Sequence, residues 1–249
     1  MDLNGEKVLI LGALGTAGTA IAKKFAQEGA AMMLSARRAS EGEKLADELR
    51  GLGNEVGFVA ADVTKRDQVI SAVEATVARF GRIDVLVNCF SRDHLRRFMD
   101  DTEEAWDEII DVNFKGLMYA CHASLQHMVP QSYGRIVSLT SDSGKIGATM
   151  ETAQSGMKAA VIAFSKSLAR EMARYNITVN SVCMGPTRES SEAPTGMSPE
   201  GWASFMRLIP FRRPAKPEEV AAVVAFLATK DASFVTGQAL SASGGLVMS

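Results

Sequence analysis

The stretch that decides the fold is residues 7–18, which read KVLILGALGTAG. The apolar run predicts a short buried strand, and the glycines after it predict a tight turn into a helix. Gly12, Gly15 and Gly18 let the backbone turn sharply and bring N–H groups close to a phosphate at the helix N-terminus. A tight strand-to-helix turn without any ligand also fits the motif taken alone.

Outward from this turn, short apolar runs alternate with longer segments of helical periodicity. The predicted strands are 7–11, 30–36, 56–61, 85–87, 135–139, 178–182 and 238–241. The predicted helices are 19–27, 41–52, 68–80, 106–128, 152–175 and 217–229, with a loop at 185–199. This alternation predicts an α/β fold, a doubly wound parallel sheet with helices on both faces. No repeat or linker divides the chain, so residues 1–249 are expected to form one domain.

In a doubly wound sheet, ligands bind beyond the carboxyl ends of the strands. That rule points to the turns at 12–18, 88–91, 138–147 and 183–189. The second predicted strand ends at Arg37 and Arg38, where an acidic residue would hold a ribose 2′-hydroxyl and an arginine accommodates a 2′-phosphate. The pair therefore hints at NADP, and a solvated basic turn is an equally compatible interpretation.

The composition argues against several classes of protein. Hydrophobic residues make up 47% of the chain and the formal net charge is −2, which favours neither nucleic acid nor an anionic membrane as a partner. The N-terminal apolar run is too short to span a membrane and no cleavable signal is visible, so we expect a cytoplasmic protein. Cys89, Cys121 and Cys183 are expected to be free thiols, and the histidines lack the spacing of metal ligands, so no metal site is predicted.

The most specific pattern lies near the C-terminus, where RPAKPEEV occupies 213–220, VTGQ occupies 235–238 and a glycine pair follows at 244–245. Together with Asp62-Val63-Thr64 and Asp111-Val112-Asn113, this pattern resembles the single-domain branch of the short-chain dehydrogenase/reductase family. The resemblance covers essentially the whole chain and implies a Rossmann-type fold. It also implies that Asp62 contacts an adenine.

The family's chemistry uses a tyrosine as proton donor, a lysine four residues later that lowers the tyrosine pKa, a serine and an asparagine. The resemblance assigns the asparagine to Asn113, the serine to Ser141 and the lysine to Lys158. The tyrosine position holds Gln154. A primary amide does not act as a general acid near neutral pH, and such proton transfer typically contributes about 10²- to 10⁴-fold in rate. These residues are therefore expected to be the remains of a catalytic site.

The cofactor side departs from the family pattern as well. Thr16 stands where the second glycine is usual, with Gly15 one place early, and is expected to crowd the phosphate-facing backbone. Asn88-Cys89-Phe90-Ser91 replaces Asn-Asn-Ala-Gly, which puts a large ring beside the cofactor. The resemblance thus implies a degenerate cofactor site with no NAD(P) or weakly bound NAD(P), at the following residues: Gly12, Gly15, Gly18, Arg37, Asp62 and Asn88.

The leading hypothesis is a non-catalytic subunit that pairs, as in a heterotetramer, with an active short-chain dehydrogenase paralogue. That partner would use NAD(P) to oxidise a β-hydroxyacyl-CoA to the β-keto form. Arginines could help to hold a CoA thioester, or could be ordinary surface residues: Arg92, Arg96, Arg97, Arg188, Arg207, Arg212 and Arg213. Two alternatives stay open, an active oxidoreductase with an altered acid/base mechanism and a ligand-sensing regulatory module.

Overall fold

The protein was analysed as a computed structural model that describes residues 1–190, 192–193 and 197–249. Within these residues, seven strands form one parallel sheet in the order β3-β2-β1-β4-β5-β6-β7. The strands are β1 (Lys7–Leu11), β2 (Ala31–Ala36), β3 (Val56–Ala60), β4 (Val85–Asn88), β5 (Gly134–Ser141), β6 (Ile177–Met184) and β7 (Ala239–Ala242). The predicted α/β class and the doubly wound parallel sheet are confirmed.

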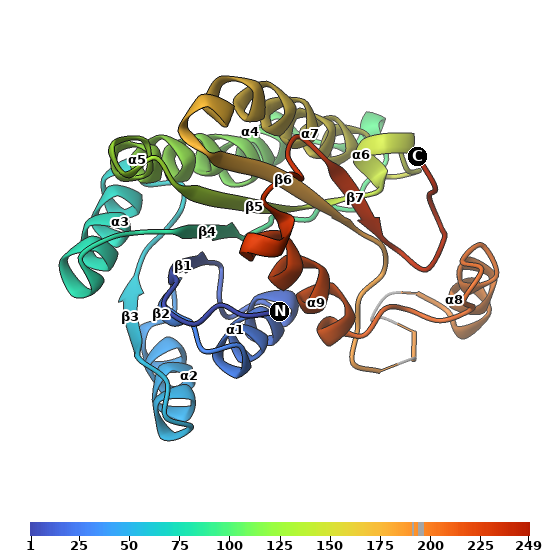
Figure 1. The fold of residues 1–249 in the computed structure, drawn as a ribbon. Helices are drawn as coiled ribbons and strands as arrows, with labels where there is room; N and C mark the ends of the chain where they lie inside the picture. Colours follow the sequence, from blue (N-terminus) through green and yellow to red (C-terminus); the bar gives the residue numbers. More distant parts are fainter. Residues whose placement is uncertain (191, 194–196) are drawn as a thin grey trace.

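Helices cover both faces of the sheet (Figure 1). One face carries α1 (Thr16–Gln27), α2 (Ala39–Gly51) and α9 (Pro217–Ala228). The other carries α3 (Arg66–Phe80), α5 (Gly116–Gln131) and α7 (Thr152–Met172). Because both faces are covered, the central strands are apolar throughout instead of alternating, as the buried pattern of β1 and β4 illustrates.

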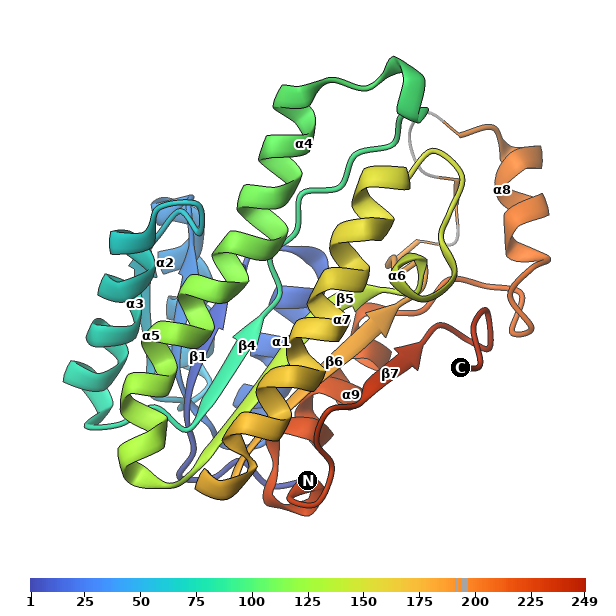
Figure 2. The ribbon, with the colours of Figure 1, turned by 90° about the horizontal axis from the view of Figure 1, so that it is seen from above.

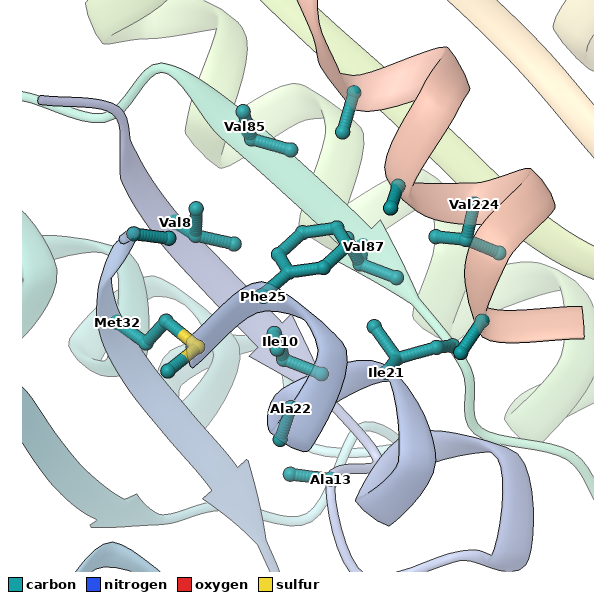
Figure 3. Packing of buried hydrophobic residues seen from close by; sticks show 14 of the residues in the cluster. Val8, Ile10, Ala13, Ile21, Ala22, Phe25, Met32, Val85, Val87 and Val224 are labelled. Carbon is teal, nitrogen blue, oxygen red and sulfur yellow. The ribbon is translucent and has the colours of Figure 1, made fainter. Parts of the chain in front are cut away.

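The core divides into two layers, one on each side of the sheet. Figure 3 shows the layer under α1 and α9, where Phe25 and Ile21 of α1 pack against Val8 and Val87 of the strands and Val224 of α9. All five side chains are fully buried. Burying one such side chain contributes about 1.5–3 kcal/mol, so this layer holds the first strand–turn–helix unit firmly in register.

The prediction of one regular helix at 106–128 was wrong in two respects, where the helix begins and whether it is α-helical throughout. Helix α4 (Glu103–Ile110) begins earlier, because Thr102 caps it by accepting a hydrogen bond from the backbone N–H of Ala105. A π-helical turn, η2 (Asp111–Lys115), then joins α4 to α5. Figure 2 shows α4 and α5 as one rod beside α7. Single π turns inside helices often mark functional sites.

The remaining differences from the prediction lie at element ends and in loops. Helix α1 starts at Thr16 instead of residue 19, because Gly15 already serves as its N-cap. Two short helices, α6 (Ser143–Ile146) and α8 (Pro199–Met206), were missed, and Ser198 caps the second of them. The predicted loop at 185–199 falls partly on residues 191 and 194–196, which lie outside the described residues. Short 3-10 turns stand at 98–100, 173–175 and 230–232.

Candidate active site

The residues singled out from the sequence gather at the carboxyl edge of the sheet, in two groups. Gly12, Gly15, Arg37 and Asp62 line a cavity of about 370 Å³. A second group surrounds a void of about 10 Å³, and its walls include Asn88, Asn113 and Lys158 together with Ser138, Leu139, Leu117 and Val161. Phe90 lines both spaces and therefore stands between them.

The glycine turn is fixed by close backbone packing. Gly12 has a φ of +88°, and a Cβ there would lie 2.6 Å from the backbone nitrogen of Phe90. A Cβ on Gly18 would lie 2.3 Å from the carbonyl oxygen of Gly12. At Gly15 the nearest atom would be 3.6 Å away, an ordinary van der Waals contact. The fold therefore requires Gly12 and Gly18, whereas Gly15 is not required by packing.

The larger cavity lies beside this turn and opens to solvent. Thr16 is exposed on the first turn of α1 and is not among the residues that line the cavity. Thr16 therefore does not narrow this cavity, and Phe90 is one of the large side chains that line it. The full lining is Gly12, Leu14, Gly15, Ala36, Arg37, Arg38, Ala61, Asp62, Val63, Cys89, Phe90, Ser91, Arg92, Glu108 and Val112.

Asp62 is the acidic group of this cavity. Burial raises the pKa of its carboxyl, but hydrogen bonds from the backbone and the hydroxyl of Thr64, with the charges of Arg37 and Lys65, bring that pKa below its usual value. The two Thr64 hydrogen bonds reach Asp62 Oδ1 at 2.9 and 2.8 Å. Asp62 is thus a carboxylate at neutral pH and can accept a hydrogen bond from a ligand.

The two arginines after β2 differ in their surroundings. Arg38 forms an ion pair of 2.7 Å with Glu41 in the first turn of α2. Arg37 is exposed at the cavity wall, and among the described residues no ion pair or side-chain hydrogen bond is recorded for it. Arg37 is therefore available to an anion in the cavity, whereas Arg38 already has Glu41 as an ion-pair partner.

Lys158 lies beside the smaller void, away from Asp62, and only 5% of its surface is exposed. Its Nζ donates to Ser91 Oγ at 2.6 Å and to Asn113 Oδ1 at 3.4 Å, and it lies 3.7 Å from Asp93 Oδ1. Burial lowers the pKa of Lys158, and the Asp93 carboxylate partly offsets this. The ammonium group is therefore satisfied by the chain's own segment after β4.

Asn113 lies within the π-helical turn and is buried. Its Nδ2 donates to the carbonyl oxygens of Ile109 and Arg92, at 3.0 and 2.9 Å. Its Oδ1 accepts a hydrogen bond from the Arg92 backbone N–H at 3.2 Å, in addition to the one from Lys158. Asn113 thus binds the backbone of Arg92 to the turn between α4 and α5.

Gln154 is buried on the first turns of α7, four residues before Lys158. Its Oε1 accepts a hydrogen bond of 2.7 Å from the backbone N–H of His94. Its Nε2 donates to Asp93 Oδ1 at 3.4 Å. Both ends of the amide therefore bind the segment Ser91–His94, which we call the inner segment.

The inner segment continues into a second set of contacts. His94 Nε2 lies 2.9 Å from Asp101 Oδ1, and Asp101 Oδ2 accepts a hydrogen bond of 2.9 Å from Trp106 Nε1. The backbone N–H of Arg96 donates to the carbonyl of Met150 at 2.8 Å. These contacts attach the chain between β4 and α4 to the start of α4 and to the loop before α7.

Sequence reasoning missed the inner segment as a functional element. The signal was present, because the motif after β4 departs from the family pattern at Phe90 and Ser91. That departure was interpreted only as an enlarged side chain, and nothing local indicates that Ser91 Oγ lies 2.5 Å from Asp93 and 2.6 Å from Lys158.

Two predicted site residues take other partners. Ser141 Oγ accepts a hydrogen bond of 3.1 Å from the Ser143 backbone N–H, at the start of α6. Within the described part of the chain, no hydrogen bond joins Ser141 to Gln154 or Lys158. Asn88 Nδ2 donates to Ser138 Oγ at 3.2 Å, which ties β4 to β5 beneath the small void.

The arginines proposed for an anionic substrate are partly engaged within the chain. Arg92 pairs with Glu108 at 3.1 Å, and Arg213 forms two hydrogen bonds with Glu219, at 2.7 and 2.6 Å. The Arg213 hydrogen bonds lower the pKa of Glu219 to about 2. Arg92 and Arg213 are therefore poor candidates for holding a CoA thioester in this conformation.

The cysteines are free thiols, with Cys121 and Cys183 buried and Cys89 half-buried. Burial raises the pKa of Cys89 to about 12, so it is not a reactive thiolate near neutral pH. Among the described residues, no group of three or more potential ligands is arranged to hold a metal ion. In the same residues, no helix is long and apolar enough to cross a membrane.

Comparison with known sequences places these features in context. A family model described as "Enoyl-(Acyl carrier protein) reductase" matches residues 12–247. The 3-oxoacyl-[acyl-carrier-protein] reductase FabG of Thermotoga maritima is 39% identical, with 100% of both chains covered. FabG of Chlamydia pneumoniae is 34% identical, with 99% of this chain and 98% of the relative covered. The oxidoreductase UcpA of Escherichia coli is 39% identical over 94% of this chain and 92% of its own.

Solved structures give the same relationship. An actinorhodin polyketide ketoreductase variant with NADPH superposes with a TM-score of 0.89 at 31% identity, covering 99% of both chains. NAD⁺-bound xylitol dehydrogenase superposes with a TM-score of 0.93 at 30% identity, covering 98% of this chain and 100% of the other. Both structures hold a nicotinamide cofactor in a fold that spans nearly all of this chain.

Proposed function

The chain belongs to the short-chain dehydrogenase/reductase family of oxidoreductases, and from that premise we propose that it is a non-catalytic subunit of a dehydrogenase complex. The catalytic subunit is an active paralogue that uses NAD(P) to oxidise a β-hydroxyacyl-CoA to its β-keto form. The complex is of the kind that oxidises 2-[hydroxy(phenyl)methyl]succinyl-CoA in anaerobic toluene degradation, where one of two similar subunits is inactive. Assembly takes place in the cytoplasm.

The observation that carries the proposal is the use made of Gln154. The amide occupies the tyrosine position on α7, and both of its polar ends are bound to His94 and Asp93 of the inner segment. The amide does not ionise near neutral pH, and its side chain is buried. Proton delivery to a carbonyl oxygen, which needs a donor of suitable pKa within hydrogen-bond reach, has no candidate at this position.

The nicotinamide cofactor implied by the family does not fit the whole cleft. The turn at Gly12, Asp62 and Arg37 leave about 370 Å³ for one half of a dinucleotide. At the other half, the void next to Asn113 and Lys158 is about 10 Å³, and the Lys158 ammonium group already donates a hydrogen bond to Ser91. A ribose and nicotinamide at Lys158 would require the inner segment to leave, so we derive no hydride-transfer step in this chain.

Two outward surfaces support assembly with a related chain. Helices α5 and α7 lie side by side on one face of the sheet (Figures 1 and 2). The exposed side of α7 carries small residues, Gly156 and Ala163, which allow another helix to approach closely. Near the C-terminus, Phe234 and Met248 are almost completely exposed and Phe226 is 37% exposed. Exposed apolar side chains of this size are common at protein–protein interfaces.

The second candidate is an active oxidoreductase with an altered proton donor. It is favoured by one observation, the direct hydrogen bond of 3.4 Å between Lys158 Nζ and Asn113 Oδ1, which keeps two of the four family residues together. Turnover by the isolated chain that disappears in Lys158→Ala would establish this activity.

The experiment is a comparison of the isolated chain, the purified paralogue and their mixture. Native mass spectrometry should give a mixed tetramer, and steady-state assays with β-hydroxyacyl-CoA and NAD⁺ or NADP⁺ should give turnover only when the paralogue is present. A homotetramer of this chain that turns over substrate alone would overturn the proposal.

A matched pair of variants locates the interface. A side chain at Gly156 meets no atom within 4 Å in the chain, and the same holds for Gly51 at the end of α2. Gly156→Leu should therefore leave the isolated chain folded and weaken the mixed tetramer, whereas Gly51→Leu should leave both unchanged. Equal tetramer formation by both variants would exclude the α7 surface as the interface.

A further inference from the structure

The outer side of α4, α5 and α7 carries opposite charges at its two ends, and we propose that it pairs with a second copy of this chain. We call this surface the charged face and define it as the exposed side chains of residues 103–131 and 152–174. The pairing is antiparallel, so that the acidic end of one copy meets the basic end of the other. It holds for the isolated chain and does not require the active paralogue.

The acidic end lies at the start of α4, on the carboxyl side of the sheet (Figure 2). Three exposed acids there have no ion pair within the described residues: Glu103, Glu104 and Asp107. The next two acids along the rod are already paired, Glu108 with Arg92 and Asp111 with Lys115. The first two turns of α4 therefore carry negative charge that no residue of this helix compensates.

The basic end lies in the C-terminal part of α7, on the amino side of the sheet (Figure 2). Three exposed cations follow at intervals of four residues: Lys166, Arg170 and Arg174. In the part of the chain that the structure describes, no ion pair is recorded for them, and the one exposed acid among them is Glu171. Like charges four residues apart lie on the same side of a helix and repel each other, so this row favours an anionic partner from outside.

Helix dipoles explain only part of this pattern. The dipole stabilises acids in a first turn and bases in a last turn, and its effect falls off within one turn. Glu103 and Glu104 stand in the first turn of α4 and Arg170 in the last turn of α7, so they fit this explanation. Asp107 and Lys166 lie outside those turns, and the dipoles do not account for their charges.

The two ends are too far apart to neutralise each other within one copy. Gln154 lies near the start of α4, because it binds His94 and His94 contacts Asp101. Lys166 follows Gln154 by 12 residues on α7, which is about 18 Å at 1.5 Å per residue. Exposed charges more than about 10 Å apart are largely screened at 0.1 M salt. Close compensation therefore needs a second molecule.

A twofold axis perpendicular to the helices brings the opposite ends together. The rod α4–α5 and α7 run side by side in the same direction, from the carboxyl side to the amino side of the sheet (Figures 1 and 2). In a twofold pair the same surface of two copies faces itself, and rotation about this axis reverses the second copy. The acidic end of each copy then faces the basic end of the other. Midway along α7 the exposed residues Gly156 and Ala163 are small and uncharged.

The area of the charged face is sufficient for an interface of ordinary size. Helix α7 has 21 residues and is about 31 Å long, and two helices side by side are about 20 Å wide. Pairing would bury about 600 Å² on each copy, or about 1,200 Å² in total, the lower limit of the standard class of interface. At this size complementary charges help, because they speed association and disfavour wrong orientations.

Sedimentation velocity on the isolated full-length chain measures the pairing. We expect a dimer whose Kd rises at least threefold between 50 and 500 mM NaCl. Lys166→Glu combined with Arg170→Glu should raise the Kd at least tenfold. The control combines Lys44→Glu and Arg66→Glu, which change the net charge equally at exposed positions of α2 and α3, and should leave the Kd unchanged. Equal effects of the two combinations would overturn the proposal.

Mixing oppositely reversed variants tests the contact between the ends. Glu103→Lys combined with Asp107→Lys makes both ends basic, whereas Lys166→Glu combined with Arg170→Glu makes both ends acidic. Each double variant alone should pair at least tenfold more weakly than the native chain. Their equimolar mixture should form a dimer with a Kd within about threefold of the native value. A mixture that stays as weak as its components would contradict the antiparallel pairing.

Native mass spectrometry with the paralogue separates this pairing from the proposed function. We expect two copies of this chain in the mixed tetramer, and a complex of one copy with one paralogue when Lys166→Glu and Arg170→Glu are present. A mixed tetramer of unchanged composition in that variant would exclude the charged face as the contact between copies. Failure of the paralogue to bind would refute the proposed function and leave the dimer of the isolated chain intact.

Discussion

The two ends of the cleft are built on the same sheet edge, yet they differ in what fills them. At the Asp62 end a cavity of about 370 Å³ lies between β1, β2 and the turn into α1. At the Lys158 end a void of about 10 Å³ lies next to Asn113 and Lys158, and the inner segment binds Lys158, Asn113 and Gln154. The comparison teaches that a glutamine at the tyrosine position of α7 is compatible with an intact sheet. The segment after β4 decides which part of the cleft remains open.

The largest expected effect is on the turn that both ends share. Gly18→Ala would place a Cβ 2.3 Å from the Gly12 carbonyl oxygen, backbone that cannot move without displacing β1. We expect the free energy of unfolding to fall by about 3 kcal/mol, the upper part of the usual range for overpacking. Gly15→Ala is the matched control, since its nearest contact would be 3.6 Å, and should cost less than about 1 kcal/mol.

Urea unfolding followed by circular dichroism measures this difference. Equal losses in the two variants would show that the turn is not held by the close approach of Gly18 to Gly12. The open end of the cleft would then depend on something other than this packing.

A smaller effect is expected at the filled end alone. Gln154→Ala removes the acceptor of the His94 backbone N–H and leaves that donor without its partner, which costs about 1–3 kcal/mol. Gln126→Ala, at an exposed position of α5, should change stability by less than about 0.5 kcal/mol. Hydrogen exchange adds a local measurement, since the His94 amide should exchange faster in Gln154→Ala than in Gln126→Ala. An unchanged rate would mean that the inner segment is held without Gln154.

Sequence periodicity predicted the sheet and its covering helices because each of them depends on local patterning. The glycine turn and the carboxyl-edge location of Asp62 followed from strand ends, whereas the grouping of Asn113 with Lys158 was implied by the family resemblance. The π turn at Asp111–Lys115 did not, because one extra residue in a helical turn leaves the apolar pattern almost unchanged. The inner segment depends on hydrogen bonds between residues 21 to 67 positions apart, which no local pattern carries.

Protonation of Lys158 gives a second way to test the filled end. Burial lowers its pKa in the folded chain, so between that pKa and the unfolded value of about 10.4 the unfolded chain binds more protons. The contribution of Lys158 to stability therefore rises with pH across this window, by at most about 1.4 kcal/mol per pH unit. Below this pH window Lys158 is charged in both the folded and the unfolded chain, so its contribution to the free energy of unfolding no longer changes with pH.

The buried thiols change stability with pH in the opposite direction to Lys158, so their contribution must be removed from the measured pH dependence. Burial raises the pKa of Cys89 and of Cys121 to about 12, so they reduce stability as the pH rises above their ordinary values. The difference in unfolding free energy between the native chain and Lys158→Met cancels these shared groups. That difference should increase with pH in the alkaline range, and a flat difference would mean that Lys158 keeps its ordinary pKa.

The smallest expected effect is on catalytic activity. We expect Gln154→Tyr to restore no turnover, and this result bears most directly on function. A tyrosine at this position would supply the missing phenol four residues before Lys158, but the ammonium would still bind Ser91 and lie near Asp93. A phenol without an adjacent free cation keeps an ordinary pKa, and the inner segment still occupies the space next to it. Assays with NADH and NADPH on β-ketoacyl-CoA thioesters should therefore stay at background for the single variant. Measurable turnover would show that the inner segment leaves the site readily, and it would place the two ends of the cleft in one functional pocket after all.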